Sequence, residues 1–231
     1  MVPVNKIKLA VFDVAGTTAQ DGGLVVEAFQ SAMVSMGTAK GTPEMARMTD
    51  YVNATMGERK IDVFMHLCDG NSTKANTAHD RFVESYIALV NAGKLKEFDG
   101  VTELFTRLRA NGIAVAITTG FPREILDNVI DGLKWANVID FSVAASEVPF
   151  GRPAPDMILR SIDLYNKKFN THISPEDIAV IGDTESDMQS GVRAGAQIVA
   201  GVSTGAHNPE QLFATGATHV LHGAIELPTI C

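Results

Sequence analysis

The stretch IKLAVFDVAGTT (7–18) decides the fold, because a continuous apolar run ends there in an aspartate, followed by small and hydroxyl residues. Continuous apolar runs of this length are typical of strands that are buried on both faces of a parallel sheet. Polar residues that close such strands lie at the carboxyl edge of the sheet, where ligands bind in open α/β folds. Asp13 is therefore the first candidate for a functional side chain.

Five more strand-like runs follow, at 113–120, 141–146, 178–183, 196–205 and 218–223. Segments with apolar residues three and four positions apart lie between them, at 101–112, 123–135, 155–169 and 186–196. Such spacing predicts amphipathic helices. The alternation of strand and helix predicts an α/β fold with a doubly wound parallel sheet.

One interval breaks this alternation. Residues 22–97 contain only helix-like sequence, such as LVVEAFQSAMVSMG (24–37) and AHDRFVESYIALVNAG (78–93). We expect a core domain of residues 1–21 and 98–231, with a helical cap domain of residues 22–97 inserted after the first strand. The alternative is a set of extra helices packed on the sheet. Hinge candidates are the glycine-bearing crossings Gly22-Gly23 and Asp99-Gly100.

The composition excludes several classes of protein. The chain has 231 residues, 45% of them hydrophobic, and a formal net charge of −8. This negative charge argues against general binding to the phosphate backbone of nucleic acids. Its two cysteines, Cys68 and Cys231, give no disulfide framework. The N-terminus lacks the apolar core of a signal peptide, and no run approaches the roughly 20 apolar residues of a membrane span. We expect a cytoplasmic protein with no membrane partner.

Four strand ends or following loops are polar: Asp13, Thr118-Thr119-Gly120, Gly151-Arg152-Pro153 and the segment 182–187 with Asp183 and Asp187. Each alone is compatible with a helix cap, a turn or a solvated loop. Together, at one sheet edge, they supply a nucleophilic carboxylate, carboxylates for a hard cation, hydrogen-bond donors and a fixed positive charge. These groups are the ones that phosphoryl transfer needs.

In this order the four motifs resemble the haloacid dehalogenase superfamily over nearly the whole chain, with Arg152 where a lysine is more usual. The resemblance implies that Asp13 attacks phosphorus to form an aspartyl-phosphate. It also implies a Mg²⁺ ion held by Asp13, the backbone carbonyl of Ala15, Asp183 and Asp187. Thr118 would bind the phosphoryl group and Arg152 would neutralise its charge. The remaining implied substrate-binding residues are Ala15, Gly16, Thr17, Met56, Thr119 and Gly120.

Ala15 is a departure, because phosphatases of the superfamily carry a second aspartate there to protonate the leaving group. Alanine has no proton to donate. The segment DVAGTT (13–18) is similar to the DxAGT motif of the phosphonatase branch, the phosphonoacetaldehyde hydrolases, whose leaving group is a carbon. Cleaving a C–P bond requires a sink for the electron pair, and a lysine Schiff base provides one.

The segment MGERKID (56–62) resembles the phosphonatase MGxxKID segment and makes Lys60 the candidate Schiff-base lysine. Arg59 beside it is expected to depress the pKa of the amine. The alternative is a solvated helix lysine. Three positions depart from the phosphonatase pattern: Val63 replaces a histidine, Phe121 a tyrosine and Gly23 a cysteine. The proton-transfer step is therefore unassigned.

Three functions are compatible with the sequence. The first is C–P bond hydrolysis of phosphonoacetaldehyde or a related phosphonate through an Asp13 aspartyl-phosphate and a Lys60 Schiff base. The second is hydrolysis of small phosphate monoesters without the usual second aspartate. The third, a non-catalytic phosphate-binding protein, has no need of the nucleophile. Each predicts a small-molecule partner, and the resemblance implies a homodimer formed through the cap.

Overall fold

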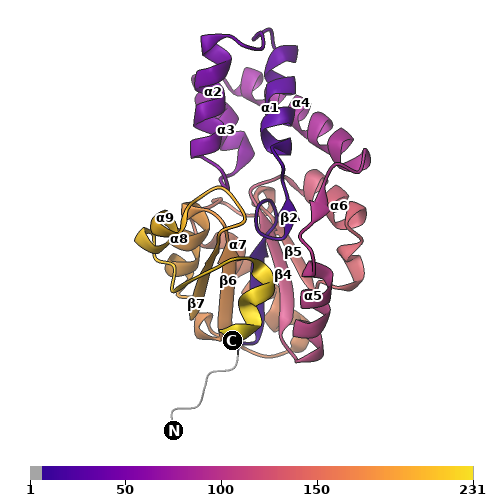
Figure 1. Cartoon of the computed structure of the whole chain (residues 1–231), viewed down its shortest axis with the longest axis vertical. Coiled ribbons are helices and arrows are strands. Elements are labelled where there is room, and N and C mark those ends of the chain that lie inside the picture. The colour runs from indigo at the N-terminus through magenta and orange to yellow at the C-terminus, as the bar shows by residue number, and fades with distance from the viewer. Residues whose placement is uncertain (1–6, 231) are drawn as a thin grey trace.

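A computed structural model describes residues 7–230, and its central feature is a six-stranded parallel sheet in the order β5-β4-β1-β6-β7-β8 (Figure 1). The strands are β1 (Leu9–Asp13), β4 (Ala114–Thr119), β5 (Phe141–Ala144), β6 (Ile178–Gly182), β7 (Ile198–Val202) and β8 (His219–Leu221). Each predicted apolar run contains one of them, so the predicted α/β fold with a doubly wound parallel sheet is confirmed. Cys231 and residues 1–6 lie outside the described residues.

Five helices flank the sheet: α5 (Val101–Ala110), α6 (Arg123–Gly132), α7 (Asp156–Phe169), α8 (Glu185–Ala194) and α9 (Pro209–Ala214). Short 3₁₀ turns lie at 135–137, 145–147, 175–177 and 224–229. The helix expected over 123–135 ends earlier, because the backbone turns left-handed at Lys134 with φ 59°. Asn208 caps α9, since its side chain accepts a hydrogen bond from the Gln211 amide.

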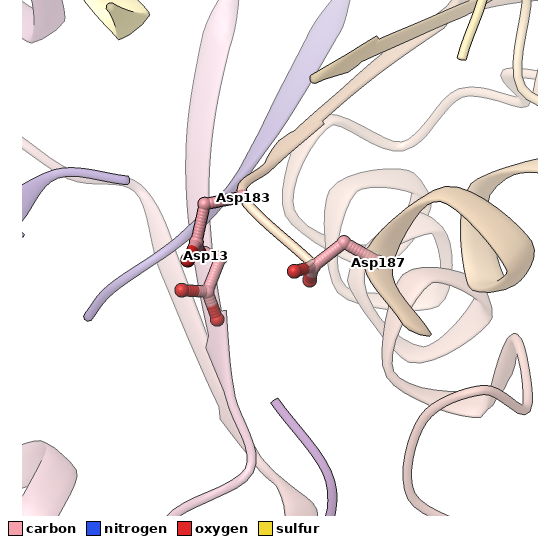
Figure 2. A group of neighbouring side chains, drawn as sticks. All are labelled: Asp13, Asp183 and Asp187. Atoms are coloured by element: carbon pink, nitrogen blue, oxygen red, sulfur yellow. The ribbon is translucent and has the colours of Figure 1, made fainter. Parts of the chain in front are cut away.

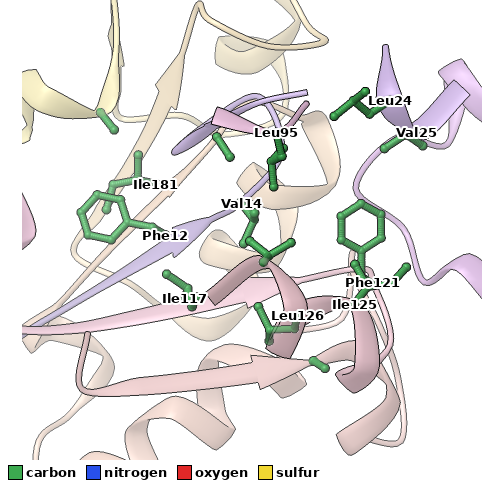
Figure 3. Packing of buried hydrophobic residues seen from close by; sticks show 14 of the residues in the cluster. Phe12, Val14, Leu24, Val25, Leu95, Ile117, Phe121, Ile125, Leu126 and Ile181 are labelled. Atoms are coloured by element: carbon green, nitrogen blue, oxygen red, sulfur yellow. The ribbon is translucent and has the colours of Figure 1, made fainter. Parts of the chain in front are cut away.

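Both faces of the sheet are buried, which explains the uninterrupted apolar runs. Alternate residues of β1 face opposite ways: Leu9 and Val11 belong to the apolar cluster beneath α7, whereas Phe12 belongs to the larger cluster on the other face. Figure 3 shows Phe12 beside Ile117 and Ile181 of the neighbouring strands. Buried on both faces, β1 holds Asp13 at a fixed position at the end of the strand.

A helical insert follows β1. It consists of α1 (Leu24–Ser35), α2 (Pro43–Ala54), α3 (Lys60–Leu67) and α4 (Ser72–Asn91). These helices pack chiefly against one another, with α4 also contacting α6, and they form a separate layer at one end of the sheet (Figure 1). The inserted helical unit is thus confirmed, and the alternative of helices laid on the sheet is wrong.

The two chain crossings between sheet and insert form one antiparallel ribbon. Strand β2 (Ala19–Gln20) leads into the insert and β3 (Lys96–Glu97) leads out, with Ala19 opposite Glu97. The predicted crossings Gly22-Gly23 and Asp99-Gly100 flank this ribbon. The domain boundaries at 22 and 97, as limits of units that move separately, stay a prediction.

Aromatic packing joins the insert to the core. Phe64, Phe82 and Tyr86 pack together inside the insert, and the Tyr86 ring lies 4.6 Å, centroid to centroid, from Phe121 at the carboxyl edge of the sheet. Val63 is buried in the same apolar cluster. Within residues 7–230, no helix combines the length and apolar character that crossing a bilayer requires.

Candidate active site

Three buried carboxyl groups meet at the carboxyl edge of the sheet. Asp13 ends β1, Asp183 follows β6, and Asp187 lies in the first turn of α8 (Figure 2). Strands β1 and β6 are hydrogen-bonded neighbours, so their ends lie side by side. One oxygen from each carboxyl lies within 4.8 Å of the others. The structure therefore brings together three residues that the sequence predicted as metal ligands.

Arg152 is the positive charge of this cluster, and it is buried in the loop before α7. Its Nη1 donates to Asp13 Oδ1 at 2.5 Å and its Nε lies 2.8 Å from Asp187 Oδ1. Its Nη2 donates to the Thr118 hydroxyl at 2.6 Å. One planar guanidinium thus fixes groups from three elements, a geometry that the point charge of a lysine cannot reproduce.

The carboxyl groups outnumber the positive charge. Burial raises the pKa of Asp13 to about 7, against the opposing effect of Arg152 and with a further increase from Asp187. Burial, and then the charges of Asp13 and Asp187, raise the pKa of Asp183 well above its ordinary value. Crowded carboxylate oxygens in a site shielded from water suit a hard divalent cation, whose charge would relieve their repulsion. The donor set therefore fits a metal site.

The loop 203–207 completes this site, although the sequence assigned it no chemistry. The Ala206 amide donates to Asp183 Oδ2 at 2.7 Å, and the Thr17 hydroxyl donates to Oδ1 at 3.0 Å. The Thr204 hydroxyl donates to the Gly16 carbonyl at 2.7 Å. Both oxygens of Asp183 are thereby oriented. The available signal was the polar end of the apolar run 196–205, which resembles the other strand ends.

The other predicted substrate-binding residues lie in several places. Thr17 is fully buried and directs its hydroxyl at Asp183, so it orients a carboxylate in this structure. Thr119 and Gly120 line a cavity of about 20 Å³ between Asp13 and Lys60, enough for one water molecule. Gly16 lines a second cavity of about 380 Å³. Ala15 and Met56 line both cavities. The metal-ligand role of the Ala15 carbonyl stays a prediction.

The segment 56–60 of the insert is docked on the core. The Lys60 amide donates to the Gly120 carbonyl at 3.1 Å, and the Ser186 hydroxyl donates to the Met56 carbonyl at 3.4 Å. A Cβ atom at Gly120 would lie 2.3 Å from the Glu58 carbonyl oxygen. Glycine at position 120 is therefore required for the insert to approach this closely.

Lys60 is brought to the site by this docking. It begins α3 with only 5% of its surface exposed, and its Nζ donates to the Glu58 carbonyl at 3.1 Å. Nζ also lies 5.9 Å from the centre of the Phe121 ring. The alternative of a solvated helix lysine is therefore wrong. Burial lowers the pKa of Lys60 to about 8, although Asp13 acts in the opposite direction.

The expected influence of Arg59 on this pKa is wrong. The Arg59 guanidinium turns away, with Nη1 donating to the Pro149 carbonyl at 3.1 Å and Nε lying 3.1 Å from an Asp62 carboxylate oxygen. The nearby guanidinium that lowers the Lys60 pKa is that of Arg152, and its effect is smaller than that of burial. Arg59 instead ties the insert to the loop that carries Arg152.

Comparisons with known proteins agree with this geometry. Residues 10–201 match the family model described as haloacid dehalogenase-like hydrolase. The chain is 30% identical to a phosphonoacetaldehyde hydrolase of Bacillus cereus (strain B4264), with 82% of this chain and 74% of that protein covered. It is also 30% identical to a bifunctional phosphonoacetaldehyde hydrolase/aminoethylphosphonate transaminase of Clostridioides difficile (strain 630), and it spans 31% of that protein's length.

Solved structures show the same fold. A phosphonoacetaldehyde hydrolase-like protein from Oleispira antarctica superimposes with a TM-score of 0.79 at 21% identity, covering 97% of this chain and 91% of that one. A hydrolase from Pseudomonas syringae gives a TM-score of 0.79 at 20% identity, covering 96% of each chain. At these identities the likeness concerns the fold.

Proposed function

Because this chain belongs to the haloacid dehalogenase-like hydrolases, we propose that it hydrolyses the C–P bond of phosphonoacetaldehyde or a closely related phosphonate. The observation that carries the proposal is the position of Lys60. Its buried amine borders the same small cavity as the Asp13 carboxylate. A carboxylate that can attack phosphorus and an amine that can attack a carbonyl carbon thus line one cavity.

Asp13 is the proposed nucleophile. Its carboxylate attacks phosphorus, the C–P bond breaks, and water then hydrolyses the aspartyl-phosphate to free phosphate. Arg152 offsets the negative charge of the phosphoryl oxygens, and the Thr118 hydroxyl, which accepts a hydrogen bond from Arg152, donates its own hydrogen to the phosphoryl group. Asp13, Asp183, Asp187 and the carbonyl of Ala15 would hold Mg²⁺, which when bound would offset charge on the phosphoryl group and the nucleophile.

Lys60 is the proposed electron sink. A neutral amine adds to the aldehyde carbon, and loss of water gives an iminium ion that accepts the electron pair of the breaking C–P bond. A pKa near 8 leaves a useful fraction of the amine neutral at physiological pH. Since the insert carries Lys60 and the core carries Asp13, both groups face the substrate only while segment 56–60 is docked.

Trapping with borohydride tests the proposal. The protein is mixed with phosphonoacetaldehyde, reduced with sodium borohydride, digested and examined by mass spectrometry. We expect a reduced adduct on Lys60 when the wild-type protein is treated with substrate, and none when substrate is omitted. The control variant Lys40→Arg, changed at an exposed lysine, should form the same adduct on Lys60. Turnover without any adduct on Lys60, or full turnover by Lys60→Ala, would refute the Schiff-base route.

A second candidate is hydrolysis of small phosphate monoesters. The buried apolar side chains of Val63 and Phe121 favour it, because they replace polar groups expected of a phosphonatase. On this alternative Lys60→Ala would retain turnover of p-nitrophenyl phosphate and sugar phosphates. Asp13→Asn would abolish turnover on either function, because both use the same nucleophile.

A further inference from the structure

The cavity of about 380 Å³ adjoins the reaction site. It shares Ala15, Met56 and Asp183 with the small cavity between Asp13 and Lys60, so the two are neighbours. It is where a leaving group held over Asp13 can extend. None of the described residues that line it is a lysine, arginine or histidine. A leaving group in this space therefore meets acidic and neutral groups.

Ala15 contributes only a methyl group to this space, so position 15 has no proton to give. Asp21 lines the same cavity from the chain segment that leads into the insert. Its Oδ2 accepts a hydrogen bond from the Gly23 amide at 3.0 Å and its Oδ1 accepts one from the Val25 amide at 3.2 Å. The carboxyl group is thus held in one orientation at the start of α1.

Two titratable groups of the insert, one from each of two helices, interact electrostatically with Asp21. The charge of Lys60 in α3 acts on Asp21, and Asp21 is the charge that acts most strongly on the Tyr86 hydroxyl in α4. That hydroxyl is buried and has no hydrogen-bond partner among the described residues. A buried hydroxyl without a partner costs free energy, which substrate or water can recover by bonding to it.

Burial also prepares Asp21 for proton transfer. It raises the pKa of the carboxyl, while the Val25 and Gly23 amides and the Lys60 charge oppose the increase. A carboxyl group whose pKa lies closer to neutrality can both hold and release a proton under working conditions. Asp21 lies six residues beyond Ala15 and outside the cluster of Asp13, Asp183 and Asp187.

We propose that Asp21 is the proton-transfer residue on the leaving-group side of the site and supplies the carboxyl that position 15 lacks. The inference rests on the proposed function. On the imine route, Asp21 gives a proton to the carbinolamine hydroxyl, which departs as water and leaves the iminium ion on Lys60, and Asp21 then regains a proton from solvent. After C–P cleavage Asp21 protonates the enamine carbon, and the water that attacks the resulting iminium ion returns a proton to Asp21 as the aldehyde leaves Lys60.

With a phosphate ester the same group protonates the leaving oxygen as the P–O bond breaks. It regains a proton from the water that attacks the aspartyl-phosphate. Both routes balance, because each proton that Asp21 donates is returned within the same turnover. In either case the need for Asp21 increases as the leaving group becomes more basic.

The experiment compares Asp21→Asn with wild type on three substrates: phosphonoacetaldehyde, an alkyl phosphate and p-nitrophenyl phosphate. The alkyl and nitrophenyl esters carry the same phosphoryl group but differ in the basicity of the leaving group. We expect kcat/KM to fall by about 100-fold or more with phosphonoacetaldehyde and the alkyl ester. With the nitrophenyl ester, the factor by which kcat/KM falls should be at least about ten times smaller. Asp21→Glu should restore part of the loss.

Glu27→Gln is the matched control, since it removes an exposed carboxylate of the adjoining helix α1, which pairs with Lys94. It should leave all three rates within about twofold, as expected of an exposed surface change. An equal loss on both esters by Asp21→Asn would show that the Asp21 carboxyl only supports the backbone at the start of α1, and would overturn the inference. Unchanged rates on all substrates would overturn it as well.

The outcomes separate this inference from the proposed function. If wild type does not cleave phosphonoacetaldehyde, the proposed function fails, and the two esters alone decide the role of Asp21. If wild type cleaves only phosphonoacetaldehyde, the rate of borohydride trapping on Lys60 decides it. Slower trapping in Asp21→Asn supports the inference, and an unchanged trapping rate together with unchanged turnover overturns it.

Discussion

The guanidinium of Arg152 lies directly against the carboxylate of Asp13, with Nη1 2.5 Å from Oδ1. The same guanidinium contacts Thr118 and Asp187, so it links β1, β4 and α8 at the point where, on the proposed function, the phosphoryl group binds. An arriving phosphoryl group must share these bonds. We therefore propose two roles for the Arg152 guanidinium: it compensates the buried carboxyl groups before substrate arrives and the phosphoryl oxygens afterwards.

Arg152→Lys should test the geometric part of this role. The lysine keeps the charge but cannot reach Asp13, Thr118 and Asp187 together. We expect kcat/KM to fall by about 10- to 100-fold, and by about 10²- to 10³-fold or more in Arg152→Gln, where the charge is lost as well. Steady-state phosphate release measures both. Equal rates for arginine and lysine would mean that only the charge matters.

Asp183→Asn should abolish metal-dependent stabilisation. A bound cation stabilises the folded state by mass action, so Mg²⁺ should raise the Tm of the wild-type protein. The variant lacks one ligand and should show little shift, and its own Tm without metal should be equal or higher because one buried carboxyl is gone. Glu176→Gln, at an exposed position, is the control and should respond as wild type does. A full Mg²⁺ shift in Asp183→Asn would contradict the metal site.

Gly120→Ala should prevent docking of the insert without unfolding the core. The added Cβ would lie 2.3 Å from the Glu58 carbonyl oxygen, so segment 56–60 has to move away and carry Lys60 with it. We expect a large loss of activity with a cooperative thermal transition retained. Gly223→Ala is the matched control, because its Cβ meets only Thr204 at 3.6 Å. Comparable losses in the two variants would argue against the docked geometry.

The buried Lys60 should make stability depend on pH. Its pKa is about 8 in the folded protein against 10.5 ordinarily, so between these values the unfolded chain binds more protons and stability rises with pH. Below pH 8 the cost is constant, on the order of 3 kcal/mol for this difference in pKa. Lys60→Met should recover it at pH 7 and lose the advantage near pH 10.

Urea unfolding at the two pH values measures this effect, with Lys40→Met, at an exposed position, as the control. An advantage of Lys60→Met that is the same at pH 7 and pH 10 would show that burial of the amine is not its cause.

Most of the fold could be predicted from the sequence, because strands buried on both faces leave an unmistakable apolar run. The run that ends in Asp13 and the run that ends in Gly182 are paired neighbours in the sheet. The spacing of apolar residues did not predict where a helix ends when a local change in backbone conformation ends it. The helix that begins at Arg123 ends at Gly132, because the backbone turns left-handed at Lys134, which the apolar spacing does not encode.

The site was harder to predict, because tertiary contacts determine which groups each side chain of the site bonds to. The hydroxyl of Thr17 is a group suited to binding substrate, yet in the fold it donates a hydrogen bond to Asp183 and orients that carboxylate. Arg59 is adjacent to Lys60 in sequence but its side chain points elsewhere, toward Pro149. Asp21 carries no motif, and only the fold of the insert brings its carboxyl to the cavity beside Ala15. Sequence neighbours and spatial neighbours differ most in such loops.

The central claim is that Lys60 and Asp13 act together on a C–P bond. The most direct measurement is Mg²⁺-dependent phosphate release from phosphonoacetaldehyde, beside a panel of phosphate esters, for wild type, Lys60→Ala and Asp13→Asn. The account predicts that wild type prefers phosphonoacetaldehyde and that either substitution abolishes its cleavage. Efficient ester hydrolysis that survives in Lys60→Ala, with no release from phosphonoacetaldehyde by wild type, would contradict it.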